Sequence, residues 1–152
     1  LAAVIAHEIA HAELRHSTKR MSQTNILKGI ADEYAKKNKN ETTKIASNLV
    51  QSLTLLNNSR DDEYEADALS FKLLSSSKWY PGGIKYFFEK IIALYNSGGN
   101  RFEQLLATHP LPKDRIDKVF AQIKSSNIAP PTEDNLFYRK YSEFKINNIT
   151  QK

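Results

Sequence analysis

The chain has 152 residues, of which 40% are hydrophobic and 26% are charged, as expected for one ordinary globular domain. It has no run of about 18 apolar residues that could span a bilayer, and no cysteine, which excludes disulfides and thiolate metal sites. The 22 Lys and Arg residues exceed the 17 Asp and Glu residues, but they do not form the dense basic stripe with stacking aromatics of a nucleic-acid surface. We therefore expect no transmembrane segment and no nucleic-acid partner, and any metal ion must be held by histidine and carboxylate.

The first predicted helix covers residues 1–17 and contains the sequence HEIAH at residues 7–11. The four-residue step from His7 to His11 places both imidazoles on one helix face, about one turn apart. Glu8 lies close enough to this face to take a proton from a water molecule in a remaining coordination position. Zinc lowers the pKa of such a water to about 7 and polarises a carbonyl group, so the HExxH pattern predicts a hydrolytic zinc site.

A catalytic zinc site needs a third protein ligand, and the residues after HExxH do not supply it. The extended pattern HExxHxxGxxH requires Gly and His where this chain has Leu14 and Ser17. On one continuous helix His16 points about 140° away from His11, so we expect it to be a surface histidine near the helix C-terminus. The third ligand is therefore expected to be a carboxylate on a second helix.

Amphipathic helices are predicted at residues 24–37 and 41–56, and a further helix begins after Ser59. That helix carries the only dense acidic cluster of the chain, formed by Asp61, Asp62, Glu63, Glu65 and Asp67. Glu63 and Asp67 share a face, so one of them can bind zinc while the other orients a ligating imidazole through its free ring nitrogen. Glu65 points nearly opposite, toward solvent or a basic partner. Attraction of acidic residues to the helix N-terminus explains the start of the cluster, but not its extension to Asp67.

The second half of the chain is expected to cover these helices. A turn at residues 79–83 precedes a helix with a stripe of core residues, formed by Ile84, Phe87, Phe88, Ile91, Ile92 and Tyr95. A short helix at residues 101–107, a proline-rich loop at 108–112 and a last helix at 113–124 follow. No strand pattern is present, so we expect a mainly helical catalytic domain at residues 1–125, with a linker and an aromatic-containing polar tail at 126–152.

These motifs, in this order, resemble a family of zinc metallopeptidases. The segments HEIAH, ELRHS, SRDDEYEAD, WYPGG and THPLPKDRI are similar to those of the HtpX, Oma and CAAX prenyl protease type, metallopeptidase family forty-eight. The resemblance covers roughly residues 1–120. Because the stretch between the first two motif-bearing helices is polar, the chain resembles most the soluble, BepA-like branch found in bacterial cell envelopes.

The resemblance implies a gluzincin, a zincin-like helical domain in which the HExxH helix packs on the glutamate-bearing helix with little or no sheet. One zinc ion per chain would be bound by His7, His11 and Glu63. Glu8 would be the catalytic base, and Asp67 would orient a ligating histidine.

Two later residues, His109 and Arg115, are also implied to approach the cleft, where one of them could bind substrate or the developing oxyanion. The residues alone indicate a simpler interpretation for both. His109 is a loop histidine before proline, and Arg115 is a helix residue that can pair with a nearby acid.

The expected function is that of a zinc endopeptidase acting on unfolded or misassembled proteins, in quality control of the bacterial cell envelope or periplasm. Members of this family normally have sequence before HExxH, including strands that bind extended substrate, whereas this chain begins at Leu1 in the helix itself. We therefore expect an upstream part in the whole protein. The alternative is a latent or non-catalytic zinc-binding module that recognises partner proteins, with the aromatic tail after Pro131 lying across the cleft.

Overall fold

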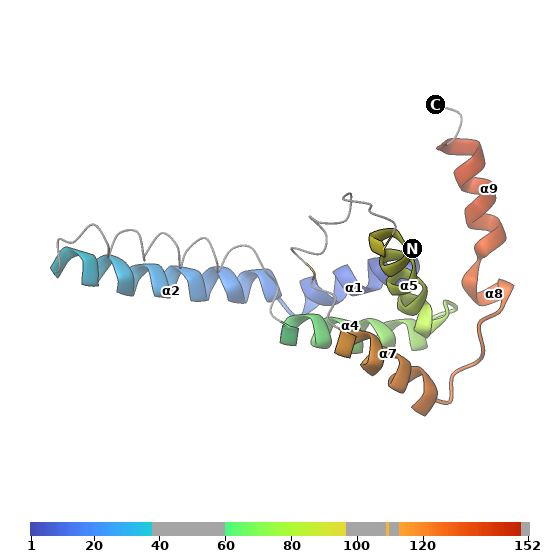
Figure 1. The fold of residues 1–152 in the computed structure, drawn as a ribbon, viewed down its shortest axis with the longest axis horizontal. Helices are drawn as coiled ribbons and strands as arrows, with labels where there is room; N and C mark the ends of the chain where they lie inside the picture. The colour runs from blue at the N-terminus through green and yellow to red at the C-terminus, as the bar shows by residue number, and fades with distance from the viewer. Residues whose placement is uncertain (38–59, 97–108, 110–112, 150–152) are drawn as a thin grey trace.

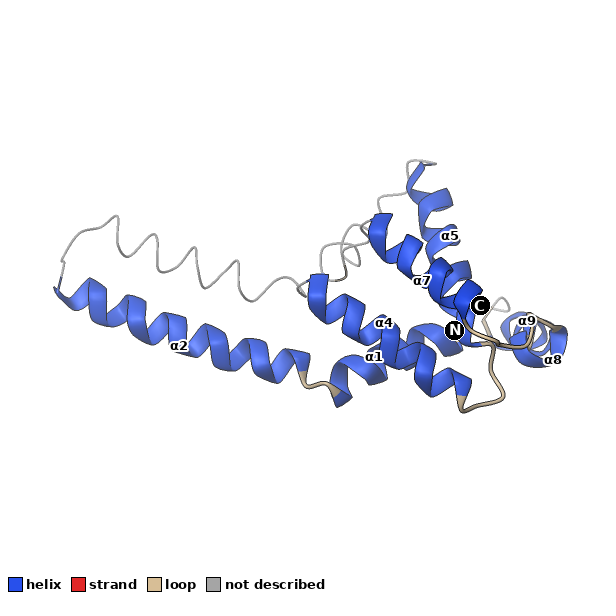
Figure 2. Ribbon diagram, turned by 90° about the horizontal axis from the view of Figure 1, so that it is seen from below, coloured by secondary structure: helices blue, strands red, loops and turns tan. Residues whose placement is uncertain are grey.

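The computed structural model describes residues 1–37, 60–96, 109 and 113–149. These residues are mainly helical and include no strand (Figures 1 and 2). The predicted helical fold is thereby confirmed. The helices predicted at residues 41–56 and 101–107, and the proline-rich loop apart from His109, lie outside the described residues.

The centre of the fold is a pair of helices, α1 (Ala2–Glu13) and α4 (Arg60–Ser75). On α1 the buried side chains recur at three- and four-residue steps, at Ala3, Ala6, His7, Ala10 and His11. The same spacing occurs on α4, at Glu63, Ala66, Asp67, Ser70, Phe71 and Leu74. Ala10 and Ala66 are completely buried, and their small side chains allow the two backbones to approach closely.

The two helices run in opposite directions, which divides their interface into an apolar half and a polar half. Ala3, near the start of α1, lies in one core cluster with Leu74, near the end of α4. His11, near the end of α1, instead contacts Glu63, near the start of α4. The apolar half supplies hydrophobic stabilisation, and the polar half collects the predicted ligands.

The apolar half is covered by three elements: η1 (Pro81–Gly83), α5 (Ile84–Asn96) and α7 (Lys113–Ser125). Ile84 and Phe88 of α5 and Val119 of α7 complete the core cluster. A Cβ atom on Gly82 would lie 2.8 Å from both Ile123 Cδ1 and Tyr80 Cε1, so a larger residue at this position would force these side chains to shift where η1 meets α7.

The predicted core stripe of α5 is confirmed at most of its positions. Ile84, Phe88 and Ile91 are buried, and Phe87 is partly buried against the same cluster. Ile92 is an exception, because its side chain is 38% exposed. The side chain of Tyr95 lies outside the description.

The predicted first helix is wrong at its C-terminal end. Helix α1 ends at Glu13, and α2 (His16–Lys37) begins three residues later instead of near residue 24. Between them Arg15 has a left-handed backbone conformation, with φ of 57°. This conformation costs a residue with a side chain about 1–2 kcal/mol, so contacts made after the break must hold it. Helix α2 then extends away from the α1–α4 pair (Figure 1).

The C-terminal residues, predicted as a linker and tail, form two helices, α8 (Glu133–Leu136) and α9 (Tyr138–Asn148). Neither helix has a buried residue. They are joined to the body by a hydrogen bond of 3.0 Å from Tyr80 N–H to the carbonyl oxygen of Asn135. The Phe137 ring also packs on Trp79, with 4.1 Å between ring centroids.

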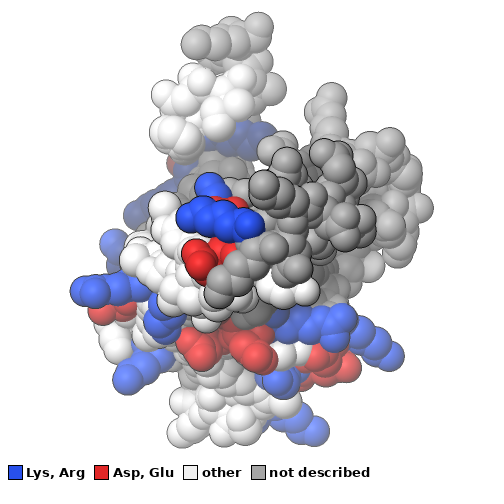
Figure 3. Space-filling view, turned by 90° about the vertical axis from the view of Figure 1, so that its left-hand side faces the viewer, with Lys and Arg blue, Asp and Glu red and all other residues white. Residues whose placement is uncertain are grey.

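Two surface properties bear on the expected partners. Within the described ranges, no helix combines the length and the apolar character needed to cross a membrane. On the face drawn in Figure 3, acidic and basic side chains of the described residues are interspersed.

Candidate metal centre

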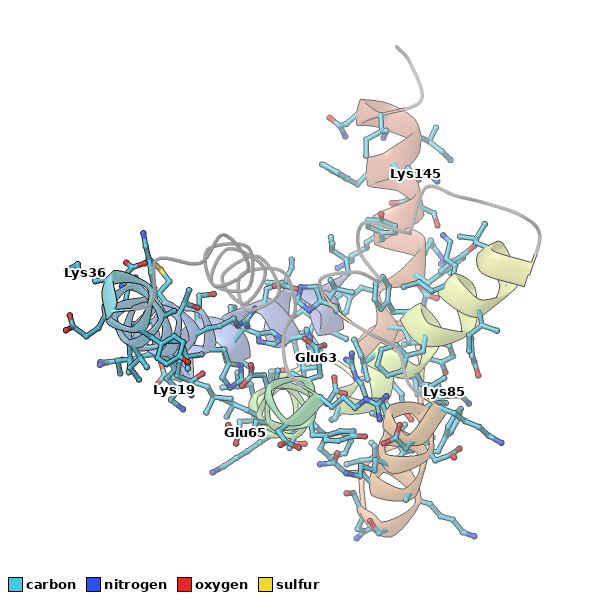
Figure 4. All side chains as sticks on the ribbon, turned by 60° about the vertical axis from the view of Figure 1, so that its left-hand side comes forward. Lys19, Lys36, Glu63, Glu65, Lys85 and Lys145 are labelled. Atoms are coloured by element: carbon cyan, nitrogen blue, oxygen red, sulfur yellow. The ribbon has the colours of Figure 1, made fainter. Side chains whose placement is uncertain are left out.

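The polar half of the α1–α4 interface brings together four groups that can hold a metal ion. One donor atom from each of His7, His11, Glu63 and His109 lies within 4.8 Å of the corresponding atoms of the others. The first three side chains are buried, and His109 is partly exposed. Figure 4 shows Glu63 on the side of α4 that faces α1, the helix that carries HExxH.

The spacing of the three buried donors fits a zinc ion. The Nε2 atoms of His7 and His11 lie 3.0 Å apart. Glu63 Oε2 lies 3.3 Å from His7 Nε2, and Glu63 Oε1 lies 3.2 Å from His11 Nε2. Atoms that bind zinc tetrahedrally at about 2.0–2.1 Å are about 3.3 Å from one another. The side chains thus already have the separations of a ligand set.

His7 on α1 and Glu63 on α4 are both buried, and their surroundings favour opposite charges on the two side chains. Burial of His7 disfavours its charged form, but the negative charges of Asp67 and Glu63 beside the ring outweigh burial and raise its pKa to about 9. Burial likewise opposes the ionisation of Glu63, but hydrogen bonds from His109, His11 and His7 and the charge of Arg115 hold its pKa well below its usual range. A cation placed between these groups would replace the proton on His7.

Asp67 and Arg115 form a buried ion pair behind these candidate ligands. The guanidinium donates from Nε and Nη2 to the two Asp67 oxygens, at 2.8 and 2.9 Å, and from Nη1 to Glu63 Oε2, at 2.6 Å. Asp67 Oδ1 also lies 3.0 Å from His7 Nδ1, but off the direction of the ring N–H, so the contact is an ion pair rather than an aligned hydrogen bond. Arg115, which is 2% exposed, therefore ties the two carboxylates together.

Glu8 and His109 occupy the exposed rim of the cluster. The Glu8 side chain is 53% exposed, and its Oε1 lies 3.8 Å from His109 Nε2. The other ring nitrogen of His109 lies 2.9 Å from Glu63 Oε1. The predicted base and the predicted loop histidine are thus neighbours beside the three buried donors.

His16 is a functional candidate that the sequence interpretation missed. The prediction of a surface histidine is wrong, because His16 is 1% exposed and its Nδ1 lies 2.7 Å from His11 Nδ1. The left-handed residue Arg15 breaks the helix, which removes the 140° separation that one continuous helix would impose. The signal that could have found this contact is the presence of three of the four histidines within residues 7–16.

A pair of helices that presents HExxH opposite a buried glutamate is the arrangement of a metallopeptidase of the gluzincin class. The model of Peptidase family M48 matches residues 1–123, so the chain belongs to this family and the expected resemblance is confirmed.

Two relatives show how much of a longer protein this chain resembles. The mitochondrial metalloendopeptidase OMA1 of Schizosaccharomyces pombe is 30% identical over 134 residues, which cover 88% of this chain and 39% of the relative. A Vibrio cholerae protein named "Putative beta-barrel assembly-enhancing protease" is 26% identical over 135 residues, which cover 76% of this chain and 26% of that protein. The chain therefore spans well under half the length of either relative. No solved structure matches it.

Proposed function

We propose that this chain is the catalytic part of a zinc-dependent endopeptidase, with His7, His11 and Glu63 as the zinc ligands. The observation that carries the proposal is the convergence of their three donor groups at separations of 3.0–3.3 Å. Zinc in such a site polarises a peptide carbonyl and lowers the pKa of water.

In this proposal Glu8 is the general base. It follows His7 on α1, yet its carboxylate lies at the exposed rim rather than in the buried network. There it can accept a proton from water and return it to the leaving amine. His109 Nε2, which faces Glu8, would donate a hydrogen bond to the substrate carbonyl oxygen, or to the oxyanion that develops from it, when the ring is protonated on both nitrogens.

The buried ion pair has a positioning role. Arg115 donates to Asp67 and Glu63, so we assign it to holding the two carboxylates rather than to contact with substrate. Asp67, beside His7 Nδ1, in turn orients that imidazole. Paired in this way, the buried charges avoid the cost of an isolated carboxylate.

We further propose that the substrates are unfolded or misassembled proteins, with quality control of a bacterial cell envelope as the setting. The name of the Vibrio cholerae relative, which refers to beta-barrel assembly, supports this choice. The catalytic domain would comprise residues 1–125, because the buried residues of the described chain end with Val119 and none lies in α8 or α9.

The test compares the full chain with its Glu8→Gln variant. We expect both to bind one zinc per chain. The parent should cleave a fluorescently labelled unfolded protein, and Glu8→Gln should cleave it about 10²–10⁴-fold more slowly. Glu13→Gln, an exposed change on the same helix, is the matched control and should cleave normally. Cleavage that survives in Glu8→Gln at the parent rate would contradict the proposal.

A second candidate function, a latent zinc-binding module, is favoured by one observation. His109 belongs to the same group of possible donors as the three ligands, and four protein ligands would leave no coordination position for water. His109→Ala distinguishes the two functions at unchanged zinc stoichiometry. Cleavage falls if His109 binds substrate, and it rises if His109 blocks the site.

A further inference from the structure

The most buried histidine of the described chain lies directly behind the candidate metal centre. His16 is 1% exposed, and its Nδ1 lies 2.7 Å from Nδ1 of His11. The other nitrogen of His11, Nε2, is the one that faces His7 and Glu63. We propose that His16 is a positioning residue that fixes the ring orientation and tautomer of His11 as a metal ligand, an inference that rests on the proposed zinc site.

The hydrogen bonding allows one consistent assignment of protons. If His11 binds a metal through Nε2, its neutral ring carries its proton on Nδ1. That N–H then donates to Nδ1 of His16, which must accept and therefore carries its own proton on Nε2. His16 Nε2 faces carboxylates, with Glu65 Oε2 at 3.4 Å and Asp62 Oδ1 at 3.8 Å. Each of the two hydrogen bonds in this relay, His11 to His16 and His16 to Glu65, then has one donor and one acceptor.

The carboxylate end of the relay is anchored on both helices. Glu65 and Asp62 belong to α4, whereas His16 begins α2. Arg20, one turn further along α2, places Nη2 3.5 Å from Asp62 Oδ2. The start of α2 is therefore tied to the helix that carries the glutamate ligand.

The local backbone supports a specific role rather than simple filling of space. Arg15 adopts the left-handed conformation immediately before His16, although that conformation is unfavourable for a residue with a side chain. Burying a polar imidazole also costs free energy unless it is hydrogen-bonded. An apolar side chain would fill the same space without needing a partner. The fold instead supplies His16 with an imidazole on one side and carboxylates on the other.

The relay can be tested by measuring zinc affinity in competition with a chromophoric chelator, and the visible absorption spectrum of Co²⁺ bound in place of zinc. His16→Phe keeps an aromatic ring but removes both hydrogen bonds, and we expect it to lower zinc affinity about 10–100-fold and to change the Co²⁺ spectrum. His16→Gln retains an acceptor and a donor, and should recover most of the affinity. Thr24→Val, a buried change on the same helix, is the matched control and should leave both measurements unchanged.

Glu65→Ala tests the relay without a buried substitution, because the Glu65 side chain is 57% exposed. We expect zinc affinity to fall about two- to fivefold. Parent-like affinity and spectrum in His16→Phe would overturn the inference, as would equal losses in the Phe and Gln variants. If His16→Phe fails to fold, unchanged affinity in Glu65→Ala would overturn it. A parent chain that binds no zinc would instead refute the proposed function itself, which separates the two failures.

Discussion

Two regions of this molecule, the α1–α4 pair and the C-terminal helices α8 and α9, are held in contrasting ways. In the α1–α4 pair, charged side chains are buried and each contacts another polar group, as Glu63 does with His11 and Arg115. In α8 and α9 no residue is buried, and apolar side chains such as Phe144 are more than half exposed. The comparison indicates that the candidate ligands are held by paired burial between two helices, and that α9 is attached at a distance from them (Figure 4).

The largest expected effect is on the buried ion pair. Arg115→Leu would leave the carboxylates of Glu63 and Asp67 buried without their cation. We expect the free energy of unfolding of the metal-free chain to fall by about 3–5 kcal/mol, measured by urea unfolding. Arg139→Leu, which removes an exposed arginine of α9, should change it by less than about 0.5 kcal/mol. Equal effects of the two substitutions would remove the contrast between the regions.

A pH-dependent effect is expected at His7 in the metal-free chain. Its pKa is raised from 6.5 to about 9 in the folded protein, so folding favours the protonated ring. This contribution to the free energy of unfolding is at most about 3 kcal/mol. It is fully present below pH 6.5 and is lost as the pH rises through about 9.

The measurement is the difference in unfolding free energy between the parent and His7→Gln, with chelator present, at pH 6.5 and 9.5. The stabilisation of the parent over the variant should shrink at the higher pH. A difference that does not vary with pH would mean that Asp67 and Glu63 do not stabilise the charged ring.

A smaller effect is expected from the carboxylate beside His7. Asp67→Asn removes the negative charge 3.0 Å from His7 Nδ1, and should weaken zinc binding about 10–100-fold in chelator competition. Asp61→Asn makes the same change at an exposed position of α4 and should bind zinc as the parent does. If the two variants bind zinc equally, Asp67 does not orient the ligand.

The parts of the site that the sequence predicts are those set by local helix geometry. His7 and His11 share a face because they are four residues apart, and the same spacing joins Glu63 to Asp67. Helix period alone could not decide which carboxylate binds the metal. The family resemblance, and not the spacing, implies that Glu63 is the ligand.

The remaining features depend on contacts between distant residues. Arg115 pairs with carboxylates 48 and 52 positions away, a distance over which periodicity carries no information. The break at Arg15 has no glycine or proline to mark it, and it is explained by the contact that it allows between His16 and His11. Helix α9 is not predicted, although Phe137, Tyr141 and Phe144 recur at four- and three-residue steps, and in the structure none of its residues is buried.

The smallest effect is expected from removal of the C-terminal helices. Deleting residues 131–152 would remove the Phe137 ring from Trp79 and the carbonyl that accepts a hydrogen bond from Tyr80 N–H. Both contacts follow the C-terminal end of α4, whereas Glu63 lies near its start. We expect a loss of about 1 kcal/mol in unfolding free energy, with zinc affinity and the rate of hydrolysis of an unfolded protein unchanged.

A tail that lies across the cleft would give a different result, because deletion would then raise the rate of hydrolysis. Phe137→Ala, which weakens the attachment without shortening the chain, should reproduce the loss of stability, and it would raise hydrolysis only if the tail covers the metal centre.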